Sequence, residues 1–125
     1  MPKRVLVVES DRATRELIEA ILVADGNVVD GAPSVAAGAA RVAGAVARHG
    51  RYDLLLVAPE LPDGRGSTVV DRARAQWGDV RVGMLVPGDP AGREAARRRY
   101  EPFADFALAT PVRPEELLAL AATEG

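Results

Sequence analysis

One uncharged run constrains the fold of this chain more than any other feature. Residues 54–59 (LLLVAP) carry no charged side chain, and Pro62, Gly64 and Gly66 follow shortly after them. A strand with one exposed face alternates polar and apolar residues, so an unbroken apolar run predicts a strand buried on both faces. In a parallel α/β sheet, ligands and reactive groups lie at the carboxyl ends of such strands. The residue near that end here is Ala58.

Four other segments have the apolar character of strands, and they alternate with segments of helical periodicity. We expect strands at residues 5–8, 27–32, 80–86 and 105–109. We expect helices from Asp11 to Gly26, Ser34 to Gly50, Gly66 or Ser67 to Gly78, 91 to 100, and from Pro114 onward. Each parallel crossover needs a helix, so this alternation predicts an α/β fold. The expected fold is a five-stranded parallel sheet with helices on both faces, in a single domain over residues 1–125.

The second of these helices has the least regular pattern. We expect Ser34 to cap it, Gly50 to end it, and its apolar side to consist of Val35, Ala39, Val42, Ala43 and Val46. Gly38 and Gly44 lie inside it. Each glycine makes the free energy of helix formation about 1 kcal/mol less favourable than alanine does. The sequence therefore predicts a helix of low intrinsic stability.

Composition excludes several classes of protein. The formal net charge of −2 and the pI near 5.4 give no positive field to attract nucleic acid or an anionic membrane. The chain has no cysteine, which excludes disulfides and thiolate metal sites, and no apolar run approaches the length of a membrane span. An acid at Glu9 interrupts the first apolar segment before a signal peptide could form. We therefore expect a cytoplasmic protein that binds neither nucleic acid nor membrane.

Four segments together resemble the receiver domain of two-component response regulators over essentially the whole chain. They are VLVVESD, DLLLVAPELPDGRG, VRVGMLVPG and DFALATPVRPEEL, in this order and spacing. The resemblance implies a CheY-like, flavodoxin-like sheet of strand order 2-1-3-4-5, with its site at the carboxyl ends of strands one, three, four and five. It also implies phosphorelay signalling, in which a histidine kinase phosphorylates an aspartate. That chemistry needs a magnesium ion held by carboxylates, together with a lysine and a hydroxyl.

The positions that the resemblance assigns to this chemistry hold other residues. The acceptor aspartate lies four residues before the loop proline, and counting back from Pro62 gives Ala58, which has no nucleophilic atom. The acid pair after the first strand falls on Glu9 and Ser10, so a hydroxyl replaces one carboxylate. The resemblance therefore implies a site that cannot form an aspartyl phosphate at the usual position.

The supporting groups of the family differ as well. The switch threonine or serine falls on Val86, the switch aromatic residue on Ala107, and the lysine on Thr110. The single lysine of the chain, Lys3, lies at the start of the first strand. A strand length of about 15 Å, at roughly 3.3 Å per residue, separates it from the site. We therefore expect no lysine to reach the position of Thr110.

Several acids remain near the acceptor position. Glu9 and Asp11 follow the first strand, and Glu60 and Asp63 follow the third. Hard cations prefer several converging carboxylates, and one is missing at Ala58. We interpret Glu9, Asp11 and Glu60 as a solvated acidic rim that could hold a cation weakly. We expect no functional magnesium site, no other metal and no cofactor.

The helix expected at residues 91–100 is rich in arginine and therefore positively charged. Such runs are typical of a solvated helix face. The alternative is a partner surface, because in the resembled family the face formed by helix four, strand five and helix five contacts other proteins. Arginine and aromatic side chains commonly anchor interfaces. The candidate partner residues are Arg93, Arg97, Arg98, Tyr100 and Phe103.

These observations favour a pseudo-receiver, a receiver fold that acts as a phosphorylation-independent protein-interaction module and not as an enzyme. Its partner would be another protein, a second copy of this chain included. The alternative is a small-molecule sensor that uses the pocket vacated by the aspartate and lysine, lined by Ala58, Val86 and Thr110. An ordinary phosphorylated receiver would need a different register. Within 53–60 just Asp53 and Glu60 are acidic, and Asp53 lies at the wrong end of the strand.

Overall fold

The main sheet contains five parallel strands, as the apolar runs predict. The computed structural model describes residues 2–87, 91, 94–95, 98–99 and 103–122. The sheet strands are β1 (Arg4–Val8), β2 (Val28–Ala32), β3 (Leu54–Val57), β6 (Arg81–Pro87) and β7 (Phe106–Thr110). Their spatial order is β2-β1-β3-β6-β7, and every neighbouring pair is parallel. Counted along the chain, the order of the sheet strands is 2-1-3-4-5, which confirms the expected flavodoxin-like topology.

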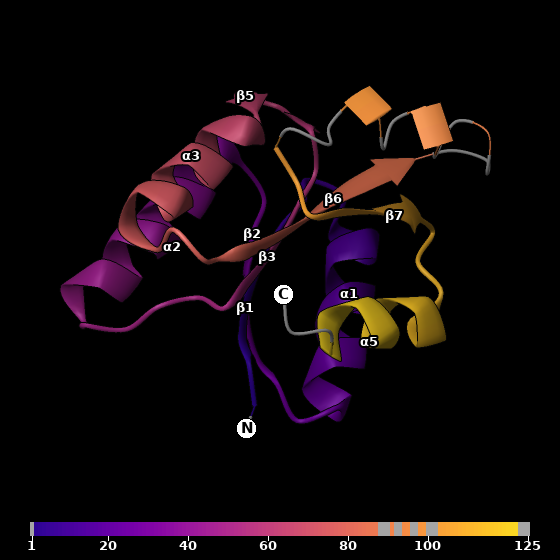
Figure 1. Ribbon diagram of the computed structural model, residues 1–125, viewed down its shortest axis with the longest axis horizontal. Helices are drawn as coiled ribbons and strands as arrows, with labels where there is room; N and C mark the ends of the chain where they lie inside the picture. Colours follow the sequence, from indigo (N-terminus) through magenta and orange to yellow (C-terminus); the bar gives the residue numbers. More distant parts are fainter. Residues whose placement is uncertain (1, 88–90, 92–93, 96–97, 100–102, 123–125) are drawn as a thin grey trace.

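Helices cover both faces of this sheet (Figure 1). On one face lie α1 (Arg12–Ala24) and α5 (Pro114–Ala122), and on the other lie α2 (Val35–Ala47) and α3 (Ser67–Gln76). In the helix expected at 91–100, the described residues 91, 94–95 and 98–99 are helical, whereas Arg93, Arg97 and Tyr100 lie outside the described residues. None of the helices that the structure describes is long and apolar enough to cross a bilayer.

The uncharged character of β3 follows from its central position between the two helical layers. Leu55 and Val57 pack on the side of α2 and α3, while Leu54 and Leu56 pack on the side of α1 and α5. All four side chains are buried. A polar residue at any of them would therefore face an apolar layer without a hydrogen-bond partner.

The starts of the two longest described helices agree with the sequence prediction. The Asp11 carboxylate accepts a hydrogen bond from the Thr14 backbone N–H at 2.9 Å and caps α1. The Ser34 hydroxyl accepts one from the Ala37 N–H at 3.1 Å and caps α2. Such side-chain caps satisfy backbone donors that have no partner within the helix.

The buried face of α2 differs from the predicted one. Gly38, Val42 and Ala45 are buried, whereas Ala43 is exposed and Val46 is 38 % exposed. The prediction was wrong at these last two positions because its apolar face through Ala43 and Val46 is rotated from the buried face, which follows Gly38, Val42 and Ala45. A Cβ at Gly38 would lie 3.1 Å from a Val69 methyl and 3.2 Å from a Val8 methyl. The missing side chain therefore allows α2 to pack closely on the sheet and on α3.

Candidate functional site

The expected acceptor position lies where the sequence placed it, at the carboxyl edge of the sheet. Ala58 follows β3 directly, is 5 % exposed, and donates its backbone N–H to the Val8 carbonyl oxygen at 2.9 Å. Val8 pairs with Val57, so Glu9 and Ala58 follow the two neighbouring strands at the same level. At the end of the neighbouring strand, Glu9 therefore has an alanine and not a second carboxylate beside it in the register.

The two supporting positions lie at the same edge. Val86 is buried and pairs with Ala109, and Thr110 pairs with Pro87 at the ends of β6 and β7. Ala107 lies deeper, where it pairs with Met84 and packs against the core on the side of α2 and α3. None of these side chains carries a charge. The edge therefore lacks a hydroxyl at the position of Val86 and an ammonium group at the position of Thr110, the groups that would bind a phosphoryl group.

The acids after β1 interact with their own backbone neighbours. A Glu9 carboxylate oxygen accepts the Ser10 N–H at 2.9 Å, and burial raises the pKa of Glu9 despite this hydrogen bond. The Asp11 carboxylate accepts the Thr14 hydroxyl at 2.5 Å in addition to its N–H, and these bonds lower the pKa of Asp11. Asp11 is therefore engaged as a helix cap.

A short hairpin after Ala58 was not predicted. Its strands are β4 (Glu60–Leu61) and β5 (Gly64–Arg65), which pair antiparallel. At its turn, the two carboxylate oxygens of Asp63 accept the backbone N–H groups of Val35 at 2.8 Å and Ala36 at 2.9 Å. These bonds lower the pKa of Asp63. Asp63, which sequence reasoning grouped with the acids near the site, thus caps α2 from 28 residues away.

The described acids do not form a metal-binding cluster. Within the described part of the chain, no group of three acidic or histidine side chains is placed so that it could hold a metal ion. Glu9, Asp11 and Glu60, the acids of the predicted rim, therefore do not converge on one point. Hard cations require several oxygen ligands at about 2.0–2.6 Å. This geometry offers a magnesium ion no ready-made ligand set.

A cavity of about 200 Å³ opens beside the acceptor position, between the hairpin, the start of α3, β6 and the segment before β7. It is lined by Pro59, Glu60, Arg65, Ser67, Met84, Arg99 and Phe103. Its lining differs from the vacated pocket of Ala58, Val86 and Thr110 that the sequence suggested. Gly66 explains part of the difference, because a Cβ there would lie 2.0 Å from the Ala58 carbonyl oxygen. The start of α3 is thus packed onto the acceptor position.

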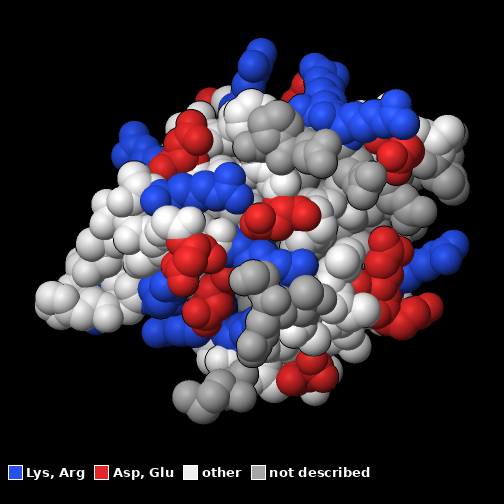
Figure 2. All heavy atoms as spheres, viewed as in Figure 1, with Lys and Arg blue, Asp and Glu red and all other residues white. Residues whose placement is uncertain are grey.

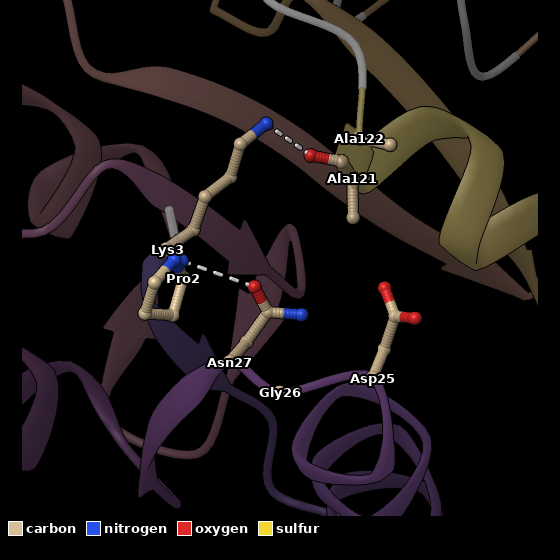
Figure 3. Close-up of a pocket in the computed structure, with 7 residues that line it drawn as sticks. All are labelled: Pro2, Lys3, Asp25, Gly26, Asn27, Ala121 and Ala122. Carbon is tan, nitrogen blue, oxygen red and sulfur yellow. Dashed lines mark hydrogen bonds between the residues drawn. The ribbon is translucent and has the colours of Figure 1, made fainter.

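A larger cavity of about 460 Å³ lies at the opposite, amino edge of the sheet (Figure 3). Lys3 lines it, donating its ammonium group to the Ala121 carbonyl and its backbone N–H to the Asn27 side-chain oxygen at 3.1 Å (Figure 3). Asn27 in turn donates its amide to the Leu22 carbonyl at 3.1 Å. Lys3 therefore stabilises the end of α5 and cannot reach the carboxyl edge, as its place in the sequence predicted.

Comparisons with known proteins agree with this architecture. No family model matches the chain, and no curated protein matches it in sequence. Among solved structures, a candidate response regulator from Chloroflexus aurantiacus is 27 % identical, with a TM-score of 0.74 over 97 % of this chain and 95 % of the other. A CheY-like receiver domain protein from Methanospirillum hungatei is 24 % identical, with a TM-score of 0.77 over 97 % and 91 %. The chain has the receiver-domain fold.

The receiver fold occurs in these matches both alone and within longer chains. The chemotaxis response regulator CheY4 of Vibrio cholerae is 24 % identical, with a TM-score of 0.74, and the match covers 97 % of each chain. In NtrX of Brucella abortus the match covers 97 % of this chain but 26 % of that chain, at 22 % identity and a TM-score of 0.75. The matched unit is therefore one receiver-sized fold in each case.

Proposed function

We propose that this receiver domain is a pseudo-receiver, which does not accept a phosphoryl group at the usual position and acts as a protein-interaction module in cytoplasmic two-component signalling. The observation that carries the proposal is Ala58, which follows β3 at the carboxyl edge of the sheet. An aspartyl phosphate requires a carboxylate oxygen as nucleophile. A methyl group has no lone pair with which to attack phosphorus. The domain is accordingly not an enzyme in this proposal.

The surroundings of Ala58 support the same function. Val86 and Thr110 provide no ammonium group at the ends of β6 and β7. Phosphoryl transfer depends on metal ions and cationic groups that neutralise the developing charge. Asp63 and Asp11, two of the acids near the acceptor position in the sequence, already accept backbone hydrogen bonds at helix starts. Restoring the reaction would therefore take several substitutions.

The surface beside β7 is the proposed partner face. Phe103 is 41 % exposed, and Arg98 is exposed with its guanidinium 3.8 Å from the Glu94 carboxylate. Exposed ion pairs of this kind contribute little to stability, so Arg98 can exchange Glu94 for a partner's acid at small cost. β7 is also an edge strand of the sheet. This face therefore combines an aromatic ring, a guanidinium group and a strand edge, which suit a protein interface. The partner on it can be a second copy of this chain.

Intact-mass measurement tests the loss of phosphotransfer. The protein is incubated with magnesium and acetyl phosphate beside a receiver that retains its aspartate, and the mass of each is recorded. We expect a phosphoryl adduct on the control receiver and none on this chain. An adduct that disappears in Glu9→Gln or Glu60→Gln would refute the proposal, because another carboxylate would then have taken over the reaction.

Affinity capture and sedimentation test the partner face. Arg98→Glu and Phe103→Ala should abolish capture of the partner or dissociate a dimer, while Arg72→Glu should leave both unchanged. Arg72 is exposed on α3 and lies outside the proposed face, so it controls for the change of charge. Equal capture by all three variants would place the interface elsewhere.

The cavity beside β3 favours a second candidate function, the sensing of a small ligand. It lies between the hairpin after Ala58 and Phe103 of the proposed partner face. A ligand that binds one conformation of these segments more tightly would shift their population. Screening for compounds that raise the melting temperature tests this function, because binding to the native state stabilises it.

A further inference from the structure

The cavity beside β3 has both apolar and cationic residues in its lining. Its apolar part comes from Pro59, Phe103 and Met84, of which Met84 is 1 % exposed. The remaining lining comes from Arg65, Arg99 and polar residues of the loop and helix. Small-molecule sites typically pair an apolar lining with a few polar groups that fix orientation. This cavity has that composition.

The charges around the cavity favour an anion. Two guanidinium groups, of Arg65 and Arg99, face one carboxylate, that of Glu60. Glu60 and Arg65 are paired residues of the hairpin, yet no ion pair joins their side chains in the described structure. Figure 2 shows basic side chains along the top of this face, with acidic side chains between them. The residues that line the cavity therefore carry a formal charge of +1, although the whole chain carries −2.

Ser67 adds an independent polar contribution to the same cavity. It is the first residue of α3, a helix of 10 residues without a side-chain cap and without an acid in its first turn. The start of a helix carries a partial positive charge and favours negative groups. The hydroxyl of Ser67 and the arginine side chains thus point to the same kind of ligand.

The volume of the cavity limits the size of that ligand. A cavity of about 150 Å³ can hold benzene, and a water molecule takes about 30 Å³. The 200 Å³ observed here therefore fits one aromatic ring with one small charged group. A nucleotide or a peptide segment would extend beyond it.

We propose that this cavity binds a small organic anion, in which a flat apolar group lies against Phe103 and Met84 and a phosphate or carboxylate lies between Arg65, Arg99 and Ser67. Arginine suits both anions because its planar guanidinium forms paired, charge-assisted hydrogen bonds. The site differs from the acceptor position, since Ala58 does not line it. The proposal rests on the ligand-sensing function of this cavity, for which it names the ligand class, and it does not depend on whether the domain is phosphorylated.

Titration of the whole protein with defined probes tests the site. Phenyl phosphate and benzoate are added to ¹⁵N-labelled protein and amide shifts are followed, with inorganic phosphate and phenol as controls for the anion and the ring alone. We expect saturable shifts at residues 60–69, Met84 and Phe103 with phenyl phosphate or benzoate, and weaker binding of both controls. The tighter of the first two identifies the anion as phosphate or carboxylate.

Three substitutions separate this site from nonspecific charge attraction. Arg65→Gln should weaken binding about tenfold, the loss expected for one charge-assisted hydrogen bond. Arg72→Gln, which removes an exposed arginine of α3 outside the cavity, should leave the affinity unchanged. Glu60→Gln should tighten binding, because it removes the single carboxylate of the lining.

The direction in which each substitution changes the affinity for the probe tests the proposal. A gain of affinity in Glu60→Gln cannot come from a misfolded protein, so it guards against a trivial loss in the Arg65 variant. No saturable shifts at millimolar probe, equal affinities in the Arg65 and Arg72 variants, or weaker binding in Glu60→Gln would each overturn the proposal. A phosphoryl adduct in the mass assay would overturn the pseudo-receiver function while leaving this site standing.

Discussion

Gly66 offers a quantitative test of how α3 is seated on the acceptor position. A Cβ on Gly66 would lie 2.0 Å from the Ala58 carbonyl oxygen and 2.6 Å from a Val57 methyl. Carbon atoms in contact normally lie about 3.5–4.0 Å apart, so Gly66→Ala requires a shift of more than about 1 Å. The neighbouring backbone resists that shift, because Gly66 donates its N–H to Pro59 at 3.0 Å and Ala58 donates to Val8 at 2.9 Å.

The expected cost follows from this geometry. Overpacking of a tightly packed region costs about 1–3 kcal/mol. The φ of Gly66 is −59°, which alanine tolerates, so steric overlap and not backbone strain produces the loss. The unfolding entropy is roughly 2.1 cal/mol/K per residue, so the free energy of unfolding of a 125-residue domain falls by about 0.26 kcal/mol per degree near its melting temperature. A loss of about 2 kcal/mol therefore lowers the melting temperature by about 8 °C.

Gly78→Ala is the matched control. A Cβ at Gly78 would meet nothing within 4 Å, and its φ is not in the left-handed region. Alanine there should leave stability unchanged or raise it by about 0.4–1 kcal/mol through the unfolded state. Calorimetry and urea unfolding of both variants provide the comparison. If Gly66→Ala melts at or above the temperature of the wild type, the close packing of α3 on Ala58 is wrong.

Three further predictions concern other contacts. Val42→Ala should cost about 2 kcal/mol and Val46→Ala less than about 0.5 kcal/mol in urea unfolding, and equal losses would contradict the observed buried face of α2. Asp63 has a lowered pKa, so its contribution to stability is present above about pH 3.8 and is lost as the pH falls through its folded value. Asp63→Asn should therefore flatten the decline of the urea midpoint between pH 5 and 3, and an unchanged decline would argue against this cap. The Tyr52 hydroxyl donates to Asp30 at 2.6 Å, and burial raises the pKa of Tyr52 to about 12. Tyr52→Phe should cost about 1–2 kcal/mol and remove an absorbance change near pH 12; a Tyr52 that titrates near pH 10 would show that the phenol is solvated.

The strands could be predicted from the sequence because central parallel strands have a local signature. Residues 54–57 and 82–86 are buried on both faces, so their apolar character appears as an unbroken run. Side-chain caps are local as well, and Ser34 was expected as a cap from its position before a periodic segment. The family resemblance, counted back from Pro62, assigned the acceptor position to Ala58, and the structure places Ala58 directly after β3.

Contacts between distant segments could not be predicted in this way. Asp63 bonds Val35 and Ala36 because the hairpin brings them together, and nothing near Asp63 in the sequence signals this partner. The buried face of α2 was mispredicted because a glycine has no side chain to mark it as a core residue, whereas close packing places Gly38 there. The cavity likewise depends on the hairpin, whose two-residue strands are too short to show a pattern.

The contacts that hold the hairpin in place couple the displacement of one part of the domain to another. Its turn is held to the start of α2 by Asp63, and the residue after it, Gly66, rests on the backbone of Ala58. The first turn of α2 and the edge of β3 are thereby mechanically coupled through a loop of about eight residues. A protein that displaced α2 would also move Glu60 and Arg65, and the size of the ligand cavity would change with them.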